Sequence, residues 1–375
     1  MAATAETGAT AAMPTAEGTG SMLPFLALLG LALAWFLLPL IPALREFLRP
    51  TDIAALKVVD RSSGYVAYFA RNFRQYVGRQ TAAMPLSQQT GDFVGRLPDG
   101  TQVVRLSAAG AVERPGVGPQ ALEHRLVVFE APRTLSGGET FLMEVYAREP
   151  LTGGPRAVYR AVYAERDLAL GEGSTVLRWA HAVGRMTVGP NSELRGRISS
   201  DAGVVLGAGT VFERIGAPVI WTDADEPSEP PPPPPSMPKA FKLPDDARQV
   251  GDHTRIEGDL VIPEGVRVPG HLVVAGTLRI GLGTIIEGSV KAHRDVELAA
   301  EAQVKGAVVT RTRLIVGPGA WIGGPAIAEM SIRLDRGAVV GGADLPATAS
   351  APEVELARGA TVYGQISAPN GGRTT

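Results

Sequence analysis

Aliphatic and glycine residues recur every 18 positions through the C-terminal half of this 375-residue chain. The first column of the repeat reads Leu260, Leu278, Val296, Leu314 and Ile332. Two positions later the column reads Ile262, Ile280, Leu298, Val316 and Leu334, and ten positions later it is glycine throughout: Gly270, Gly288, Gly306, Gly324 and Gly342. A fixed period of this length indicates a chain that stacks identical structural units.

A β-solenoid accounts for the period. Aliphatic residues at positions i and i+2 lie on one side of a strand, and a glycine after them lets the chain turn a corner. Each coil then stacks on the last at one strand spacing, roughly 4.8 Å, so that the inward columns form a continuous core. The sequence therefore predicts a mainly β protein, with a main β-solenoid (β-helix) of 18 residues per coil over residues 245–366.

The same period continues upstream. Leu168, Met186 and Val204 are again 18 positions apart, which predicts a first group of coils over residues 167–221. Asn191 occupies a position of the turn column that glycine fills elsewhere, and asparagine tolerates a positive φ better than most residues.

An acidic and proline-rich segment, residues 222–244, separates the two groups of coils. Its six consecutive prolines, Pro230 to Pro235, are typical of a stiff polyproline II spacer. The segment is either a linker between two short solenoids or a loop that leaves one long solenoid. Phe241 and Leu243 fall one residue from the expected register, which favours a single solenoid with an insertion.

Composition limits the chemistry of the chain. With 36 basic and 38 acidic residues, the chain has no overall attraction to nucleic acid. It contains no cysteine, which excludes disulfides, thiolate metal sites and a cysteine nucleophile. Neither a Walker A sequence nor a zinc-ligand spacing occurs. We therefore expect no enzymatic activity, no cofactor, no metal and no small-molecule substrate.

One segment is apolar enough to cross a membrane. The 22 residues from Leu23 to Leu44 carry no charge, which predicts a transmembrane helix over residues 22–48 after a disordered tail, residues 1–21. No lysine or arginine precedes this helix, whereas several follow it from Arg45 onward. Because basic residues stay on the cytoplasmic side, we expect a single-pass protein of the inner membrane with its bulk in the cytoplasm.

Residues 50–166 predict a β-rich or α+β domain next to the membrane. Its first part has aromatic and basic residues at helical spacing, which would either contact the membrane surface or pack on the next domain: Tyr65, Tyr68, Phe69, Arg71, Phe73 and Arg74. Further on, β-branched and aromatic runs alternate with Gly/Pro turns. His124 beside Glu123 is interpreted as structural.

The repeat Leu278-Arg-Ile280-Gly-Leu-Gly283-Thr-Ile-Ile286-Glu-Gly288-Ser-Val290 resembles the bactofilins, the polymer-forming cytoskeletal proteins of bacteria. The resemblance is strongest over residues 256–366. It implies a right-handed β-helix that associates end to end without nucleotide, lies on the inner membrane and recruits envelope-associated proteins that organise cell shape. The large region before the first coil departs from the small members of that family, so dimers rather than continuous filaments are an alternative.

Two other functions remain open. Left-handed hexapeptide-repeat acyltransferases share the 18-residue period and use a histidine base, for which His253, His271 and His293 are the candidates. We interpret these as surface histidines. A set of charged residues that a lyase groove would need is interpreted as solvated outer positions: Asp295, Arg311, Arg313, Arg333 and Asp335. A non-catalytic envelope or surface solenoid is the second alternative.

The end of the solenoid is the predicted self-association site. The last coil contains Val354, Leu356, Val362 and Ile366, and only a polar, glycine-containing tail follows, residues 367–375, which we expect to be disordered. An uncapped solenoid end offers open strand edges to another copy of the chain. The sequence therefore predicts a homo-oligomer or polymer formed through these four residues.

Overall fold

The computed structural model describes residues 22–41, 66–85, 91–107, 122–222, 226–232 and 238–375, in two units, Met1–Asp60 and Arg61–Thr375. In the first unit, α1 (Leu23–Leu37) continues as the 3-10 helix η1 (Leu38–Leu40). Together they form an 18-residue segment of mean hydropathy 2.3, long and apolar enough to cross a membrane, although a signal sequence shares this character. The predicted disordered tail, residues 1–21, lies outside the described residues.

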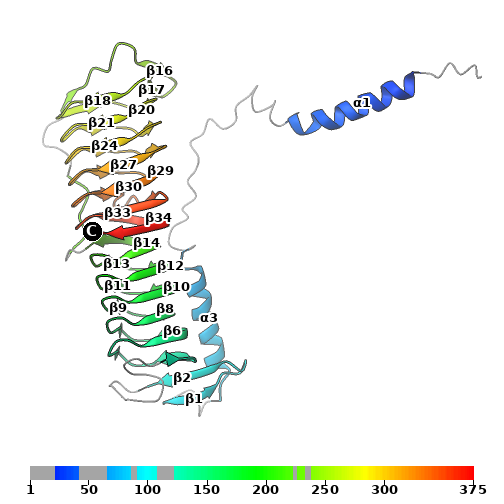
Figure 1. The fold of residues 1–375 in the computed structure, drawn as a ribbon, viewed down its shortest axis with the longest axis vertical. Helices are drawn as coiled ribbons and strands as arrows, with labels where there is room; N and C mark the ends of the chain where they lie inside the picture. The colour runs from blue at the N-terminus through cyan, green and yellow to red at the C-terminus, as the bar shows by residue number, and fades with distance from the viewer. Residues whose placement is uncertain (1–21, 42–65, 86–90, 108–121, 223–225, 233–237) are drawn as a thin grey trace, which may run out of the picture. The chain divides into compact units, whose positions relative to one another are not determined.

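The second unit is a β-solenoid that consists of two stacks of coils (Figure 1). The second stack has three faces, each a ladder of parallel strands. The first face contains β17 (His253–Ile256), β20 (His271–Val274), β23 (Val290–Ala292), β26 (Val308–Thr310), β29 (Ala326–Ala328) and β32 (Ala347–Ser350). The second contains β18 (Leu260–Ile262), β21 (Leu278–Ile280), β24 (Val296–Leu298), β27 (Arg313–Val316), β30 (Ser331–Leu334) and β33 (Glu353–Leu356). The third contains β15 (Lys239–Ala240), β19 (Val266–Val268), β22 (Ile285–Ile286), β25 (Gln303–Val304), β28 (Trp321–Ile322) and β31 (Val339–Val340).

The register of these strands confirms the 18-residue coil. Leu260 pairs with Leu278, which pairs with Val296, as the sequence columns predict. A second glycine column lies five positions after the first aliphatic one, at Gly265, Gly283, Gly319 and Gly337, and the two glycine columns have different roles. Gly283 has φ +60, a conformation that glycine adopts without strain, and Glu301 adopts φ 56 one coil later. Gly288 instead allows close packing, because a Cβ there would lie 2.3 Å from the carbonyl oxygen of Gly270.

The first stack begins well before the predicted residue 167. Its longer parallel ladder contains β2 (Gln102–Leu106), β4 (Leu126–Phe129), β6 (Thr140–Ala147), β8 (Val158–Ala164), β10 (Thr175–Ala182), β12 (Glu193–Ser200) and β14 (Val211–Thr222). The shorter strands are β1 (Phe93–Arg96), β3 (Leu122–Glu123), β5 (Arg133–Thr134), β7 (Leu151–Thr152), β9 (Leu168–Leu170), β11 (Arg185–Val188) and β13 (Gly203–Leu206). The predicted separate domain over residues 50–166 is therefore wrong from β2 onward.

The two stacks run in opposite directions and meet at their C-terminal coils. The last strand, β34 (Thr361–Thr374), crosses all three faces of the final coil and pairs antiparallel with β14 of the first stack. One hydrophobic core runs through both stacks, from Val104 to Ala368. Figure 1 shows the C-terminus beside β14, in the middle of the solenoid. The single solenoid with an insertion is therefore not what forms, because the second group of coils reverses direction.

The proline-rich segment is the linker that this reversal requires. It leaves β14 at the contact between the two stacks, where β14 pairs with β34 (the joint), and enters β15 at the far end of the second stack. Seven strand spacings separate these points, roughly 34 Å, a distance that the number of residues between them can span at ~3.1 Å per residue. Ser228 fixes its start: the Ser228 N–H donates to Thr361 Oγ1 (2.9 Å), and Ser228 Oγ donates to the Gly359 oxygen (2.9 Å).

Candidate interaction surfaces

The joint between the stacks is built from small and aliphatic residues. Ile215 of β14 lies opposite Ile366 of β34, and both side chains are fully buried. The Phe212 ring packs against Gly372, where an added Cβ would come within 2.0 Å of the ring. Thr374 Oγ1 donates a 2.7 Å hydrogen bond to the Gly207 oxygen, which ties the end of the chain to the first stack.

The predicted free end is therefore wrong. Val354, Leu356, Val362 and Ile366 are at most 2% exposed, and the edge of the last coil is paired with β14 rather than open. The tail that the sequence suggested to be disordered continues β34 as far as Thr374. It needs no apolar face of its own, because main-chain pairing with the coils on both sides of it satisfies its backbone.

A hollow of about 530 Å³ opens beside the joint on the second face, where Val211 and Gly371 form part of its lining. Three arginines line it, and each is held by a carboxylate: Arg313 by Asp295 (2.7 Å), Arg333 by Asp335 (2.7 Å) and Arg373 by Glu355 (3.0 Å). Such exposed pairs contribute little to stability, because water and salt screen them. The three arginines that line the hollow are therefore paired with carboxylates of the same chain.

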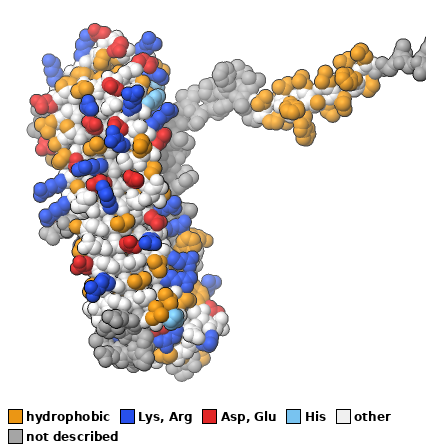
Figure 2. Space-filling model, viewed as in Figure 1, with side chains coloured by type: hydrophobic (Ala, Val, Ile, Leu, Met, Phe, Trp, Pro, Cys, Tyr) orange, Lys and Arg blue, Asp and Glu red, His pale blue; other side chains and the backbone are white. Residues whose placement is uncertain are grey.

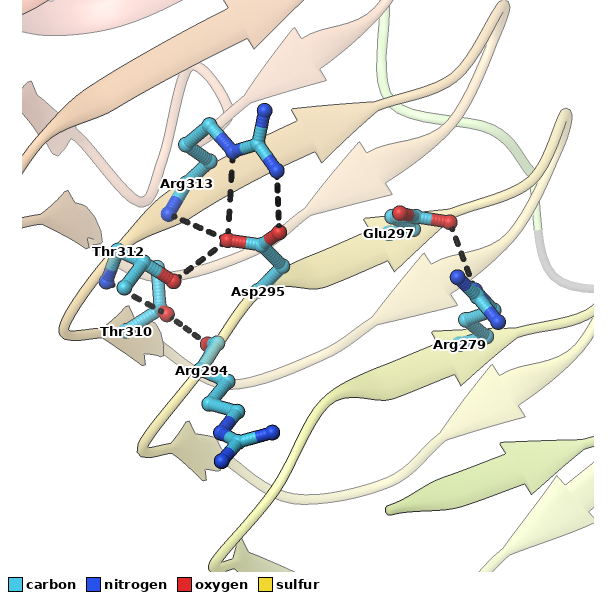
Figure 3. Close-up of polar contacts among 7 residues, drawn as sticks. All are labelled: Arg279, Arg294, Asp295, Glu297, Thr310, Thr312 and Arg313. Atoms are coloured by element: carbon cyan, nitrogen blue, oxygen red, sulfur yellow. Dashed lines mark hydrogen bonds and ion pairs between the residues drawn. The ribbon is translucent and has the colours of Figure 1, made fainter.

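Asp295 shows how these charged positions are used (Figure 3). Its carboxylate accepts hydrogen bonds from the Arg313 guanidinium, from the Arg313 N–H (3.1 Å) and from Thr312 Oγ1 (2.5 Å). The Arg313 hydrogen bond is the main cause that lowers the pKa of Asp295 to about 2. Arg311 is exposed. The arginines of this set are exposed, as expected for solvated outer positions, whereas Asp295 and Asp335 are half-buried. Asp295 pairs with Arg313 of the next coil, and Asp335 pairs with Arg333 of its own coil.

The helix α3 (Tyr68–Ala82) packs on the first stack. Of the aromatic residues predicted to contact the membrane, one is therefore packed inward and two are exposed. Phe73 points inward, with ring centroids 6.0 Å from Tyr146 and 5.3 Å from Trp179. Tyr68 and Phe69 are 57% and 46% exposed. Arg71 and Arg74 approach carboxylates of the stack: Asp201 at 3.7 Å and Glu165 at 3.9 Å. Tyr65 lies outside the described residues.

A buried polar group under α3 escaped the sequence analysis. His181 is 1% exposed, its Nδ1 lies 2.8 Å from Ser199 Oγ, and its Nε2 lies 3.7 Å from Asp201 Oδ2. These three residue types occur together in hydrolases, but the Asp201 distance exceeds a hydrogen bond and Ser199 is itself buried. Burial lowers the pKa of His181 to about 4; Asp201 opposes the shift, and Arg71 and Arg74 add to it. No sequence motif identifies this group, since only stacking brings its members together.

The histidines considered as acyltransferase bases are not brought together with a buried carboxylate. His253 lies 3.2 Å from the exposed Asp252, and His271 Nδ1 accepts a hydrogen bond from the Ser289 N–H at 2.9 Å. His293 follows β23 at a corner and is half-buried. His124 is exposed, beside a Glu123 that pairs with Arg125 at 2.7 Å. In the ranges that the structure describes, no three acidic or histidine residues cluster to hold a metal ion.

The outer end of the second stack carries exposed apolar side chains. β16 (Arg248–Val250) folds back antiparallel on β17 as the outermost strand, with all three residues exposed. Val250 is 46% and Val261 65% exposed, while Phe241 and Leu243 pack against the core. Edge strands of this kind are templates for pairing with another chain.

Comparison with family models finds no match to this chain, and neither the curated proteins nor the solved structures give a significant one.

Proposed function

We propose that this chain is a membrane-anchored, non-enzymatic scaffold of bactofilin-like design, which self-associates and recruits envelope-associated proteins along its solenoid. The observation that supports this best is the joint: the chain already joins two solenoid ends by antiparallel strand pairing. Its N-terminal apolar helix supplies the anchor. The excess of basic residues after that helix supports a cytoplasmic location for the solenoid, which a C-terminal reporter active only in the cytoplasm tests.

Because β14 occupies the C-terminal coil, we assign self-association to the outer end of the second stack. There the edge strand β16 and the side chains of Val250 and Val261 would meet the same end of another copy. Association of this kind is isologous, so it yields dimers of rods. Extension to longer assemblies would require the opposite outer end as well.

The double variant Val250→Glu/Val261→Glu is expected to dissociate the detergent-solubilised assembly, because it places like charges opposite one another across a twofold contact. Sedimentation velocity measures the change in size. Leu345→Glu is the matched control, since Leu345 is 57% exposed but lies away from this end. Particles of unchanged size in the double variant would contradict the assignment.

A further inference from the structure

One line of outward side chains along the solenoid contains no acidic residue. On the first face, strand register places nine residues in one ladder that crosses the joint: Arg255, Val273, Lys291, Val309, Ile327, Ser350, Ser367, Arg214 and Arg197. Four of the nine are basic and three are aliphatic. At one strand spacing per residue the acid-free ladder extends over roughly 38 Å.

The neighbouring second face differs. Its equivalent ladder alternates acidic, basic and aliphatic residues: Val261, Arg279, Glu297, Ile315, Arg333, Glu355 and Arg373. Two ion pairs form within the ladder: Arg279 with Glu297 at 3.1 Å and Arg373 with Glu355 at 3.0 Å. The second-face ladder therefore carries three basic and two acidic residues, whereas the first-face ladder carries four basic residues and no acidic one.

The acid-free ladder ends under the exposed end of α3. The Arg197 guanidinium lies 4.7 Å from the centre of the Phe69 ring, and Phe69 packs edge to face on Tyr68. Residues 66–85 contain three arginines and no acidic residue. Figure 2 shows basic and apolar side chains together along the edge of the first stack where α3 lies. Exposed aromatic rings beside basic side chains are typical of surfaces that lie at the interface of a bilayer.

We propose that the acid-free ladder, with Tyr68 and Phe69 of α3, lies flat on the anionic surface of the membrane. The inference rests on the proposed membrane anchor, whose last described residue, Ile41, is separated from Tyr68 by 26 residues of the chain. Each basic residue near an anionic membrane adds to the electrostatic attraction between them. The second face and its ion pairs then point away from the lipid and toward protein partners.

The absence of native cysteine allows a direct test with the full chain. Ser350→Cys on the ladder carries an environment-sensitive fluorophore, and Thr187→Cys, exposed on β11 of the first stack, carries the control label. The protein is reconstituted in nanodiscs of phosphatidylcholine, alone or mixed with phosphatidylglycerol. We expect quenching of the Ser350→Cys label by aqueous iodide to fall roughly twofold or more in the anionic discs, and to recover at high salt.

Charge reversal separates this contact from a general effect of lipid. Lys291→Glu/Ile327→Glu alters the ladder, and Arg279→Glu/Ile315→Glu likewise replaces one basic residue and one isoleucine by glutamate on the second face. The first variant should abolish the protection and the second should retain it. Equal quenching in both lipid mixtures, or equal loss in both variants, would overturn the proposal. Protection that persists in detergent would also overturn it, because a second copy or another segment of the chain would then cover the ladder. Self-association is measured separately in detergent, so its outcome does not depend on this one.

Discussion

Ile366→Asp is expected to lower the free energy of unfolding by about 4 kcal/mol or more, because it places a carboxylate in a dry core with no basic partner. Ile366 is fully buried and lies opposite Ile215, so the damage falls on the joint between the stacks. A loss of this size is a large part of the 5–15 kcal/mol that holds a typical domain together.

The matched control is Ser367→Asp, which introduces the same carboxylate one residue later on the outward side of β34. Denaturant unfolding should give a midpoint close to that of the native chain for the control and a much lower one for Ile366→Asp. Protease should also cut the linker of the Ile366→Asp variant faster. If that variant kept its stability and only changed its oligomeric state, the C-terminal coil would be a free end rather than one side of a joint.

The native chain is expected to lose stability as the pH falls from 6.5 to 4. His181→Gln is expected to abolish this loss. Burial holds the pKa of His181 at about 4 in the folded chain, whereas the unfolded chain binds this proton near pH 6.5. The unfolded state therefore binds more protons throughout this interval, so stability falls as the pH falls, by up to roughly 3 kcal/mol at pH 4. Below the folded pKa the contribution stays constant.

The measurement is the free energy of unfolding as a function of pH for the native chain, His181→Gln and the control His271→Gln. His181→Gln should flatten the slope between pH 6.5 and pH 4, and His271→Gln controls for the loss of an exposed imidazole outside the site beneath α3. The lowered pKa of Asp295, about 2, contributes mainly below pH 4, and it contributes equally in all three proteins, so it does not affect the comparison. An unaltered slope in His181→Gln would show that the ring is not held neutral beneath α3.

The repeat predicted most of the second stack because small aliphatic residues at fixed spacing determine which side of each strand faces the core. The first stack was only partly predictable. Its ladder carries inward aromatic residues such as Phe141 and Tyr159, and the register shifts by one residue between Phe141 and Glu144. A count at a fixed period fails across such a shift, so the earliest coils resembled a separate β-rich domain.

The joint could not be predicted from periodicity. Both stacks show the same repeat in sequence, and nothing in that repeat records that the second runs back toward the first. The reversal depends on a linker long enough to pass the whole second stack and on glycines such as Gly372 that admit the Phe212 ring. The spacing of the aromatic residues correctly predicted the helix α3. Only the structure shows that Phe73 packs on the first stack whereas Tyr68 is exposed.

A disulfide across the joint tests the tail-to-tail arrangement most directly. Arg214 and Ser367 are register partners in β14 and β34, at a separation that a disulfide spans. In Arg214→Cys/Ser367→Cys, mild oxidation should form an intramolecular bond in nearly every molecule, seen as a faster band on a non-reducing gel. Arg214→Cys/Ser350→Cys, one coil further apart, should form none. Dimers linked between chains, or no bond in the first variant, would contradict the account.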